Sequence, residues 1–197
     1  SMYHTNYQNR IDKAGIVLNC GQIPLVKSRY MKYINNEELP YGVNTIVAIM
    51  CYTGYNVEDA ILVNKGALDR GLFRTTYYNM YEVKEESSDV PGSTANSKFM
   101  KVTKDNVRRL KYRGYNYDHL DENGVIQLNT RMNDETVVIG KGTQEDSEDV
   151  YNDDSIVPKK GQLGYVDKVY ISDNEEGFRI AKVRIRDERI PAIGDKM

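Results

Sequence analysis

Two adjacent carboxylates, Glu58 and Asp59, stand in the stretch Gly54-Tyr55-Asn56-Val57-Glu58-Asp59-Ala60 between two apolar runs. Like charges about 4 Å apart repel by about 1 kcal/mol in water and about 4 kcal/mol at an effective dielectric constant of 20. A cation relieves that repulsion. In a regular strand the two side chains would point to opposite faces, so only an irregular backbone lets both reach one ion. Gly54 and Asn56 are residue types that permit such a backbone. The pattern predicts either a loop that approaches a metal ion or a solvated acidic turn, and both readings stay open.

A basic segment, residues 98–113, is the second candidate, because seven cations face the single acid Asp105 within sixteen residues. Tyrosines accompany it at positions 112, 115 and 117. Basic side chains that interleave with aromatic rings favour contacts with phosphates and bases. A solvated charged face is the alternative. The candidate nucleic-acid contacts are Lys98, Lys101, Lys104, Arg108, Arg109 and Lys111.

The third candidate is the stretch Ile190-Pro191-Ala192-Ile193-Gly194-Asp195-Lys196. Other chemistries lack their residues: there is no Gly-rich phosphate loop, no His-Glu-x-x-His pattern and no grouping typical of a Ser-His-Asp or Cys-His nucleophile. His4 and His119 are isolated, and we expect each to be a surface residue rather than a metal ligand.

Apolar runs with turn residues between them predict the elements that position these candidates. Residues 45–52 and 60–63 are dense in β-branched types and predict two buried strands that flank the acidic loop. Residues 136–140 predict another buried strand, and residues 75–83 a strand rich in tyrosine. Between them Asn64 can cap a short helix that Gly71 ends.

A hairpin is predicted for residues 163–171 and 178–186, joined by a turn at Gly177. In its second strand Ala181, Val183 and Ile185 alternate with Lys182, Arg184 and Arg186, which predicts one apolar and one basic face. Residues 85–98 lack periodicity and predict a mobile loop, whereas Asp121–Gly124 predict a tight turn. The six acids within residues 144–154 predict a disordered or solvated loop. Long helical periodicity is absent, so we expect a mainly β fold with few short helices.

Composition limits the class of protein. The chain has 197 residues and a formal net charge of −2, which does not favour a binder that coats nucleic acid over its whole surface. Cys20 and Cys51 stand far apart in apolar surroundings, so we expect reduced, buried thiols in an intracellular protein rather than a disulfide or zinc site. No apolar run approaches the ~20 residues of a membrane span. We expect the chain to be a piece of a larger protein.

Several ordered motifs resemble the second-largest subunit of multisubunit DNA-directed RNA polymerases. The most specific is Gly54-Tyr55-Asn56-Val57-Glu58-Asp59-Ala60-Ile61-Leu62, followed by Asp69-Arg70-Gly71-Leu72-Phe73-Arg74. The resemblance spans about residues 6–197 in order and is closer to eukaryotic than to bacterial subunits. A bias toward Asn, Tyr and Lys indicates a large DNA virus as a source. The other similar stretches are residues 22–25, 38–44, 47–49, 120–126, 137–141, 182–186 and 190–196.

The resemblance implies a domain organisation. Residues 1–74 and 189–197 are similar to a β-barrel-like part that cradles the RNA–DNA hybrid, and the second of these segments is truncated. Residues 75–188 are similar to an inserted, β-rich and OB-like domain called the wall or flap. The family's upstream nucleic acid and initiation factors lie at this wall.

The resemblance also implies a chemistry, nucleotidyl transfer that uses two Mg²⁺ ions. Glu58 and Asp59 match the acidic pair that approaches the second, nucleotide-borne Mg²⁺ through water, while the largest subunit mainly holds the first ion. Lys196 matches a lysine near the RNA 3′ end. The implied partners are the largest and other polymerase subunits, the DNA template, the RNA–DNA hybrid, nucleoside triphosphates and initiation factors, without a membrane. The implied location is the nucleus, or a cytoplasmic viral factory or virion for a virus.

Overall fold

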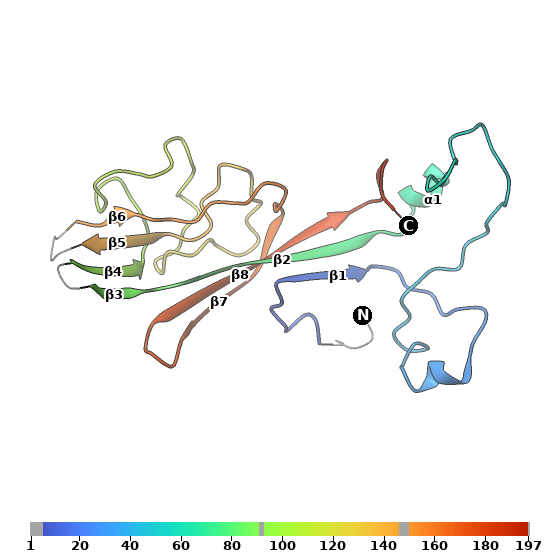
Figure 1. The fold of residues 1–197 in the computed structure, drawn as a ribbon, viewed down its shortest axis with the longest axis horizontal. Helices are drawn as coiled ribbons and strands as arrows, with labels where there is room; N and C mark the ends of the chain where they lie inside the picture. The colour runs from blue at the N-terminus through green and yellow to red at the C-terminus, as the bar shows by residue number, and fades with distance from the viewer. Residues whose placement is uncertain (1–5, 91–92, 146–149, 197) are drawn as a thin grey trace. The chain divides into compact units, whose positions relative to one another are not determined.

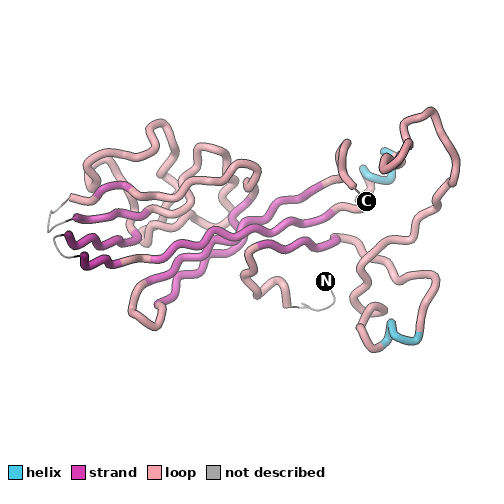
Figure 2. The backbone as a smooth tube through the Cα atoms, viewed as in Figure 1, coloured by secondary structure: helices cyan, strands magenta, loops and turns pink. Residues whose placement is uncertain are grey.

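The fold is mainly β, as predicted. A computed structural model of the chain describes residues 6–90, 93–145 and 150–196, and Figures 1 and 2 show that strands and loops make up most of them. Two four-stranded sheets have the orders β1-β2-β8-β7 and β3-β4-β5-β6. The strands are β1 (Ala14–Leu18), β2 (Thr75–Lys84), β3 (Ser87–Val90), β4 (Ser93–Phe99), β5 (Lys141–Glu145), β6 (Asn152–Asp153), β7 (Tyr165–Asp173) and β8 (Arg179–Arg189).

Helix is limited to two single turns in the described chain, the 3₁₀ helix η1 (Arg29–Lys32) and the α-helix α1 (Lys65–Asp69). The Asn64 side chain accepts a hydrogen bond of 3.0 Å from the Ala67 amide, and Gly71 follows the helix with a φ of 103°. The predicted cap and stop are thus confirmed. Neither sheet closes into a barrel within the described residues, so the β-barrel-like part of the prediction is not seen there.

The chain divides into two compact units. Of the described residues, 6–10, 15–77 and 188–196 form the first unit, and 11–14 and 78–187 form the second. The domain boundaries predicted after residues 74 and 188 stay a prediction. No helix of the described residues is long and apolar enough to cross a membrane.

The second unit holds every buried apolar side chain of the described residues. One cluster contains Phe99, Ile126 and Ile139, together with the apolar face of the β7–β8 hairpin. Ala181, Val183 and Ile185 are at most 1% exposed, which confirms the predicted apolar face. A smaller cluster gathers Val102, Val107, Tyr117, Leu120 and Val137.

The predicted basic face of the hairpin is wrong at Arg184. This side chain is buried, lies 4.8 Å from the centre of the Tyr78 ring, and pairs with Asp167. Asp167 also accepts a hydrogen bond of 2.8 Å from Arg186. Alternation gives the side of the sheet on which a residue lies, but it does not show that an acid on the neighbouring strand will draw a guanidinium inward.

In the second unit, two predicted loops and one predicted strand differ in the structure. In place of a mobile loop, residues 85–98 contain β3 and most of β4, which pair in antiparallel register, while residues 91–92 lie outside the described residues. Residues 136–140 are buried but form isolated bridges, such as Ile139 with Val125 and Ile156, rather than a continuous strand. Residues 85–98 are mostly polar and show no hydrophobic periodicity that would predict strands. Backbone hydrogen bonds define this hairpin instead.

The acidic run 144–154 is also not a simple solvated loop. Asp153 is buried in β6, where its carboxylate accepts several hydrogen bonds. Residues 146–149 of the run lie outside the described residues. The predicted tight turn at Asp121–Gly124 is confirmed, because the Gly124 amide donates to the Asp121 carbonyl and Gly124 has a φ of 79°.

The first unit lacks a hydrophobic core within its described residues. The two apolar runs expected to be buried strands contain no strand, and Ile46 and Ile49 are fully exposed. Cys20 and Cys51 are exposed as well, which contradicts the expected buried thiols. An apolar run favours burial but does not supply the covering partner or the neighbouring strand whose hydrogen bonds would make it a strand.

Candidate active site

The acidic loop of the first unit is held by Asn56. Its side-chain oxygen accepts a hydrogen bond of 3.2 Å from the Tyr52 amide, and its side-chain nitrogen donates one of 2.7 Å to the Met50 carbonyl. Three residues of the loop have left-handed backbones, with φ of 57° at Thr53, 75° at Gly54 and 57° at Glu58. The irregular backbone was expected. However, Asn56 contributes to it through its side chain, and Glu58 itself carries a positive φ.

The loop and the stretch after β8 meet at one ion pair. The Lys196 Nζ lies 3.6 Å from Asp59 Oδ2, and the two side chains are 80% and 84% exposed. The structure thus brings together two of the three residues predicted to be catalytic, although they lie at distant positions in the chain. Glu58 is exposed beside Asp59 and makes no ion pair among the described residues. Such an exposed pair can exchange partners, because water and salt screen it strongly.

Asp195 closes the turn that carries Lys196. Its Oδ2 accepts a hydrogen bond of 2.9 Å from the Ala192 amide, and its Oδ1 accepts one of 2.5 Å from Arg189 Nη2. The Asp195 amide donates to the Ala192 carbonyl at 3.1 Å, and Gly194 within the turn has a φ of 95°. The amide of Ala192, aided by Arg189, lowers the pKa of the Asp195 carboxyl.

The carboxylate pair fits a cation that brings ligands of its own. Among the described residues no three or more His, Cys, Asp or Glu side chains group into a metal site. Mg²⁺ is usually bound through one or two carboxylates together with waters and substrate phosphates, and it rarely needs an all-protein cage. Exposed Glu58 and Asp59 meet this description. Lys196 already faces Asp59, so a cation at that oxygen would displace the ammonium group.

The basic segment divides into residues with different surroundings. Lys98 belongs to β4, and Lys111 forms an ion pair of 2.8 Å with Asp154. This pair raises the pKa of the Lys111 ammonium, since the hydrogen bond to Asp154 favours the charged form. Arg108 and Arg109 are exposed. The positive charge of Lys111 is therefore already paired with Asp154, whereas Lys101 and Lys104 have no ion pair among the described residues.

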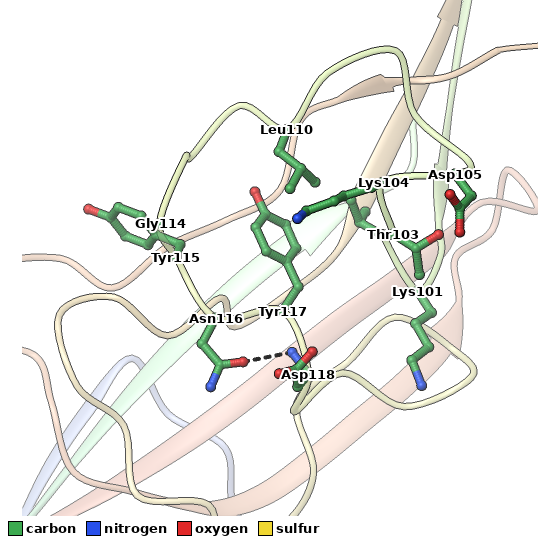
Figure 3. A pocket seen from close by; sticks show the side chains of 11 residues that line it. Lys101, Thr103, Lys104, Asp105, Leu110, Gly114, Tyr115, Asn116, Tyr117 and Asp118 are labelled. Carbon is green, nitrogen blue, oxygen red and sulfur yellow. Dashed lines mark hydrogen bonds between the residues drawn. The ribbon is translucent and has the colours of Figure 1, made fainter.

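A half-open pocket of about 610 Å³ lies beside Lys101 and Lys104 in the second unit (Figure 3). In the figure the Lys104 side chain extends toward the Tyr117 ring, and the Lys101 side chain points away from it. Two aspartates in the lining, Asp105 and Asp118, balance the positive charge of these two lysines. The lining residues are Lys101, Val102, Thr103, Lys104, Asp105, Leu110, Gly114, Tyr115, Asn116, Tyr117 and Asp118.

Two groups of polar residues that matter here were not predicted from the sequence. Asp153 accepts a hydrogen bond from Tyr117, which lines the pocket, and Asp195 with Arg189 holds the turn before Lys196. Asp153 stood within a run of acids whose simplest interpretation was solvation. Asp195 follows Gly194 in a stretch of turn residues, and an aspartate there is a usable signal because its carboxylate often closes a turn onto nearby amides.

The chain matches known RNA polymerase subunits along its whole length. A family model described as RNA polymerase Rpb2, domain 6, matches residues 1–197. The chain is 40% identical to the DNA-directed RNA polymerase II subunit RPB2 of Encephalitozoon cuniculi and 38% identical to that of Schizosaccharomyces pombe. It is 38% identical to the DNA-directed RNA polymerase subunit Rpo2 of Sulfolobus acidocaldarius.

Each of these alignments covers 99% of this chain but only 16% to 18% of the relative. The chain thus spans about one sixth of the length of the curated relatives it matches. The full-length family match and the ordered motifs around Glu58, Asp59 and Lys196 agree. This chain belongs to the family of the second-largest RNA polymerase subunit, in the part described as RNA polymerase Rpb2, domain 6.

Proposed function

We propose that this chain contributes to the catalytic core of a DNA-directed RNA polymerase, in which it acts only together with the rest of the enzyme. The observation that carries the proposal is the 3.6 Å approach of Lys196 to Asp59 beside Glu58. The names of the relatives, which are DNA-directed RNA polymerase subunits, support it. A chain about one sixth as long as those relatives is expected to need the remainder of the subunit and the largest subunit for activity.

Glu58 and Asp59 are assigned to the nucleotide side of the reaction. A Mg²⁺ ion bound with the triphosphate would supply positive charge that neutralises phosphate oxygens. The two exposed carboxylates would hold that ion through water, while the first Mg²⁺ is assigned mainly to the largest subunit. Lys196 is assigned to the phosphates and the RNA 3′ end, because an ammonium group acts there as a mobile point charge.

The ion pair gives each partner a role before the nucleotide arrives. While Lys196 faces Asp59, the two charges offset each other, and neither exposed side chain is fixed by burial. A nucleotide with its cation would offer both residues stronger partners: Asp59 would be free to hold the cation, and Lys196 would be free to bind phosphate oxygen.

The test uses the full-length subunit assembled into polymerase. Replacing Glu58→Ala together with Asp59→Ala is expected to lower the rate of nucleotide addition about 10²-fold, to leave assembly intact and to shift the Mg²⁺ titration to higher concentration. Glu38→Ala, which removes another exposed acid of the first unit, is the matched control. Wild-type elongation and an unchanged Mg²⁺ titration in the double variant would refute the assigned role.

We assign residues 1–74 and 189–197 to the part of the subunit that binds the RNA–DNA hybrid, and residues 75–188 to an OB-like wall. The partners proposed on this basis are template DNA, the hybrid, nucleoside triphosphates, other polymerase subunits and initiation factors. The strand-rich second unit, residues 78–187 with 11–14, supports the wall assignment. An intracellular location follows, the nucleus in a eukaryotic cell or the viral factory or virion for a virus.

A second candidate function is binding of nucleic acid or a protein factor by the basic segment without catalysis. Lys101 and Lys104 favour it, because both lie at the pocket without an ion pair among the described residues while Tyr115 and Tyr117 line the same pocket. Phosphate contacts release counterions, so affinity for single-stranded RNA should fall steeply between low and high salt. Lys101→Ala with Lys104→Ala should flatten that slope by about two ions. No RNA binding at low salt would leave the basic segment as a solvated face.

A further inference from the structure

The carboxylate of Asp195 has both of its oxygens engaged. Oδ1 accepts from the Arg189 guanidinium at 2.5 Å, and Oδ2 accepts from the Ala192 amide at 2.9 Å. The Asp195 side chain is 24% exposed, much less than Lys196 at 80%. Arg189 and Ala192 thus engage both oxygens of the acid that precedes Lys196.

These contacts fix the path of the chain from β8 to Lys196. Arg189 is the last residue of β8. The Arg189–Asp195 pair therefore ties the turn back to the end of this strand. Gly194, with a φ of 95°, turns the chain immediately before Asp195. What the side-chain contacts hold is the backbone on which Lys196 stands.

We propose that Asp195, held by Arg189 and by the Ala192 amide, is a positioning residue that directs Lys196 toward Asp59 and the incoming phosphates. The inference rests on the proposed function of Lys196 and adds how this lysine is held in place. A long and exposed lysine has many rotamers, so a fixed backbone restricts where its ammonium group can reach. Misplacement of a catalytic group by about 1 Å can cost about 10²-fold in rate.

Two alternative roles for Asp195 agree less well with these contacts. Asp195 could ligate the nucleotide-borne cation, but both oxygens would first have to leave Arg189 and Ala192. It could be only a turn-closing residue that stabilises the fold. In that case its loss would reduce the amount of assembled subunit, and any effect on catalysis would be independent of Lys196.

A double-mutant cycle in the assembled polymerase separates these alternatives. Asp195→Asn keeps the size of the side chain but cannot accept from both Arg189 and Ala192. It is expected to lower kcat/KM for nucleotide about tenfold to a hundredfold, as removal of a group that supports a site residue typically does. In a Lys196→Ala background the same change is expected to cause no further loss.

Two more variants keep the test informative if Asp195→Asn fails to assemble. Arg189→Gln removes the cation from a side chain that is 58% exposed, so folding should tolerate it. Arg189→Lys keeps a positive charge beside Asp195 Oδ1, so it should restore part of the activity that Arg189→Gln loses. Asp187→Asn, an exposed aspartate of the same strand, is the control and should match the wild type.

The outcomes distinguish the two levels of the proposal. If Lys196→Ala alone leaves nucleotide addition unchanged, the proposed role of the lysine is wrong. If Lys196→Ala impairs the enzyme but Asp195→Asn is neutral, or its loss multiplies with that of Lys196→Ala, the positioning role is overturned and the proposed function stands. Full non-additivity together with partial activity in Arg189→Lys supports the positioning role.

Discussion

The Tyr117 hydroxyl donates a hydrogen bond of 2.7 Å to Asp153 Oδ2, in the interior of the second unit. The same carboxylate accepts from the Lys111 amide at 2.8 Å, from the Ser155 amide at 3.0 Å and from the Ser155 hydroxyl. Burial and this bond to Asp153 raise the pKa of the Tyr117 hydroxyl. One acid thus connects the basic segment, the pocket-lining tyrosine and β6.

Asp153→Ala should destabilise the chain by about 3 kcal/mol, because it leaves several buried donors without an acceptor. The free energy of unfolding, measured by urea denaturation, checks this value. Asp154→Ala is the matched control, since Asp154 is 47% exposed and forms an ion pair with the exposed Lys111. Asp154→Ala should lower the free energy of unfolding by at most about 1 kcal/mol. Equal effects of the two changes would contradict the assigned role of Asp153.

Glu85 should make stability depend on pH. Burial raises the pKa of its carboxyl, but hydrogen bonds from Arg179 and from the Phe99 amide outweigh burial and lower the pKa below the ordinary 4.5. A carboxyl whose pKa is lowered in the folded state stabilises it above the unfolded-state pKa, and this contribution is lost as pH falls through the folded-state value. Glu85→Gln should therefore cost about 1–2 kcal/mol at pH 7, and that cost should shrink below pH 4.5.

The matched control for Glu85→Gln is Glu82→Gln in β2, the strand that ends just before Glu85. Glu82 Oε2 lies 3.8 Å from Lys182 Nζ, and the Glu82 side chain is 40% exposed. Its loss should change the free energy of unfolding little at any pH. Denaturation curves recorded from pH 3 to pH 8 compare the two variants. A difference between Glu85→Gln and the wild type that stays constant down to pH 3 would contradict the proposed contribution of Glu85.

Two isoleucines from runs predicted to be buried strands should respond in opposite ways. Ile139 is fully buried, and Ile139→Ala should cost about 2–5 kcal/mol. Ile49 is fully exposed, and Ile49→Ala should change the free energy of unfolding by no more than about 0.5 kcal/mol. Urea denaturation of this 197-residue chain measures both. A large loss in Ile49→Ala would mean that the run at residues 45–52 is covered after all.

Local chemistry made several elements predictable from the sequence. The apolar face of the β7–β8 hairpin, the Asn64 cap and the Asp121 turn each follow from nearby residues in the sequence, and each is present in the structure. Of the candidate site, the acidic pair and Lys196 were predicted as residues, and the irregular loop was predicted from Gly54 and Asn56.

Features that depend on distant partners were not predictable in the same way. Asp153 and Arg184 are charged residues that bury because Tyr117 and Asp167 come to them from other segments. The contacts of Asp195 follow the same rule, since Arg189 must end a strand at the right place to reach it. Conversely, the apolar residues 45–52 suggested a core that the described chain does not supply.

Asn56 should protect one particular amide of the acidic loop. It accepts a hydrogen bond from the Tyr52 amide and donates one to the Met50 carbonyl, so Asn56→Ala removes both. A hydrogen bond of about 1 kcal/mol corresponds to roughly fivefold faster exchange of the Tyr52 amide with deuterium. Asn56→Asp keeps the acceptor for the Tyr52 amide but sets a carboxylate oxygen against the Met50 carbonyl, so it should retain only part of that protection.

The matched control is Asn44→Ala, measured by the same hydrogen-exchange experiment. Asn44 also holds a loop of the first unit, with its side chain accepting from the Leu25 amide at 3.2 Å and donating to the Ile23 carbonyl at 2.9 Å. Its removal should speed exchange at Leu25 and leave Tyr52 unchanged, while Asn56→Ala does the reverse. If Tyr52 exchanges equally fast in the wild type and in Asn56→Ala, Asn56 does not hold the loop. The approach of Asp59 to Lys196 would then not depend on Asn56.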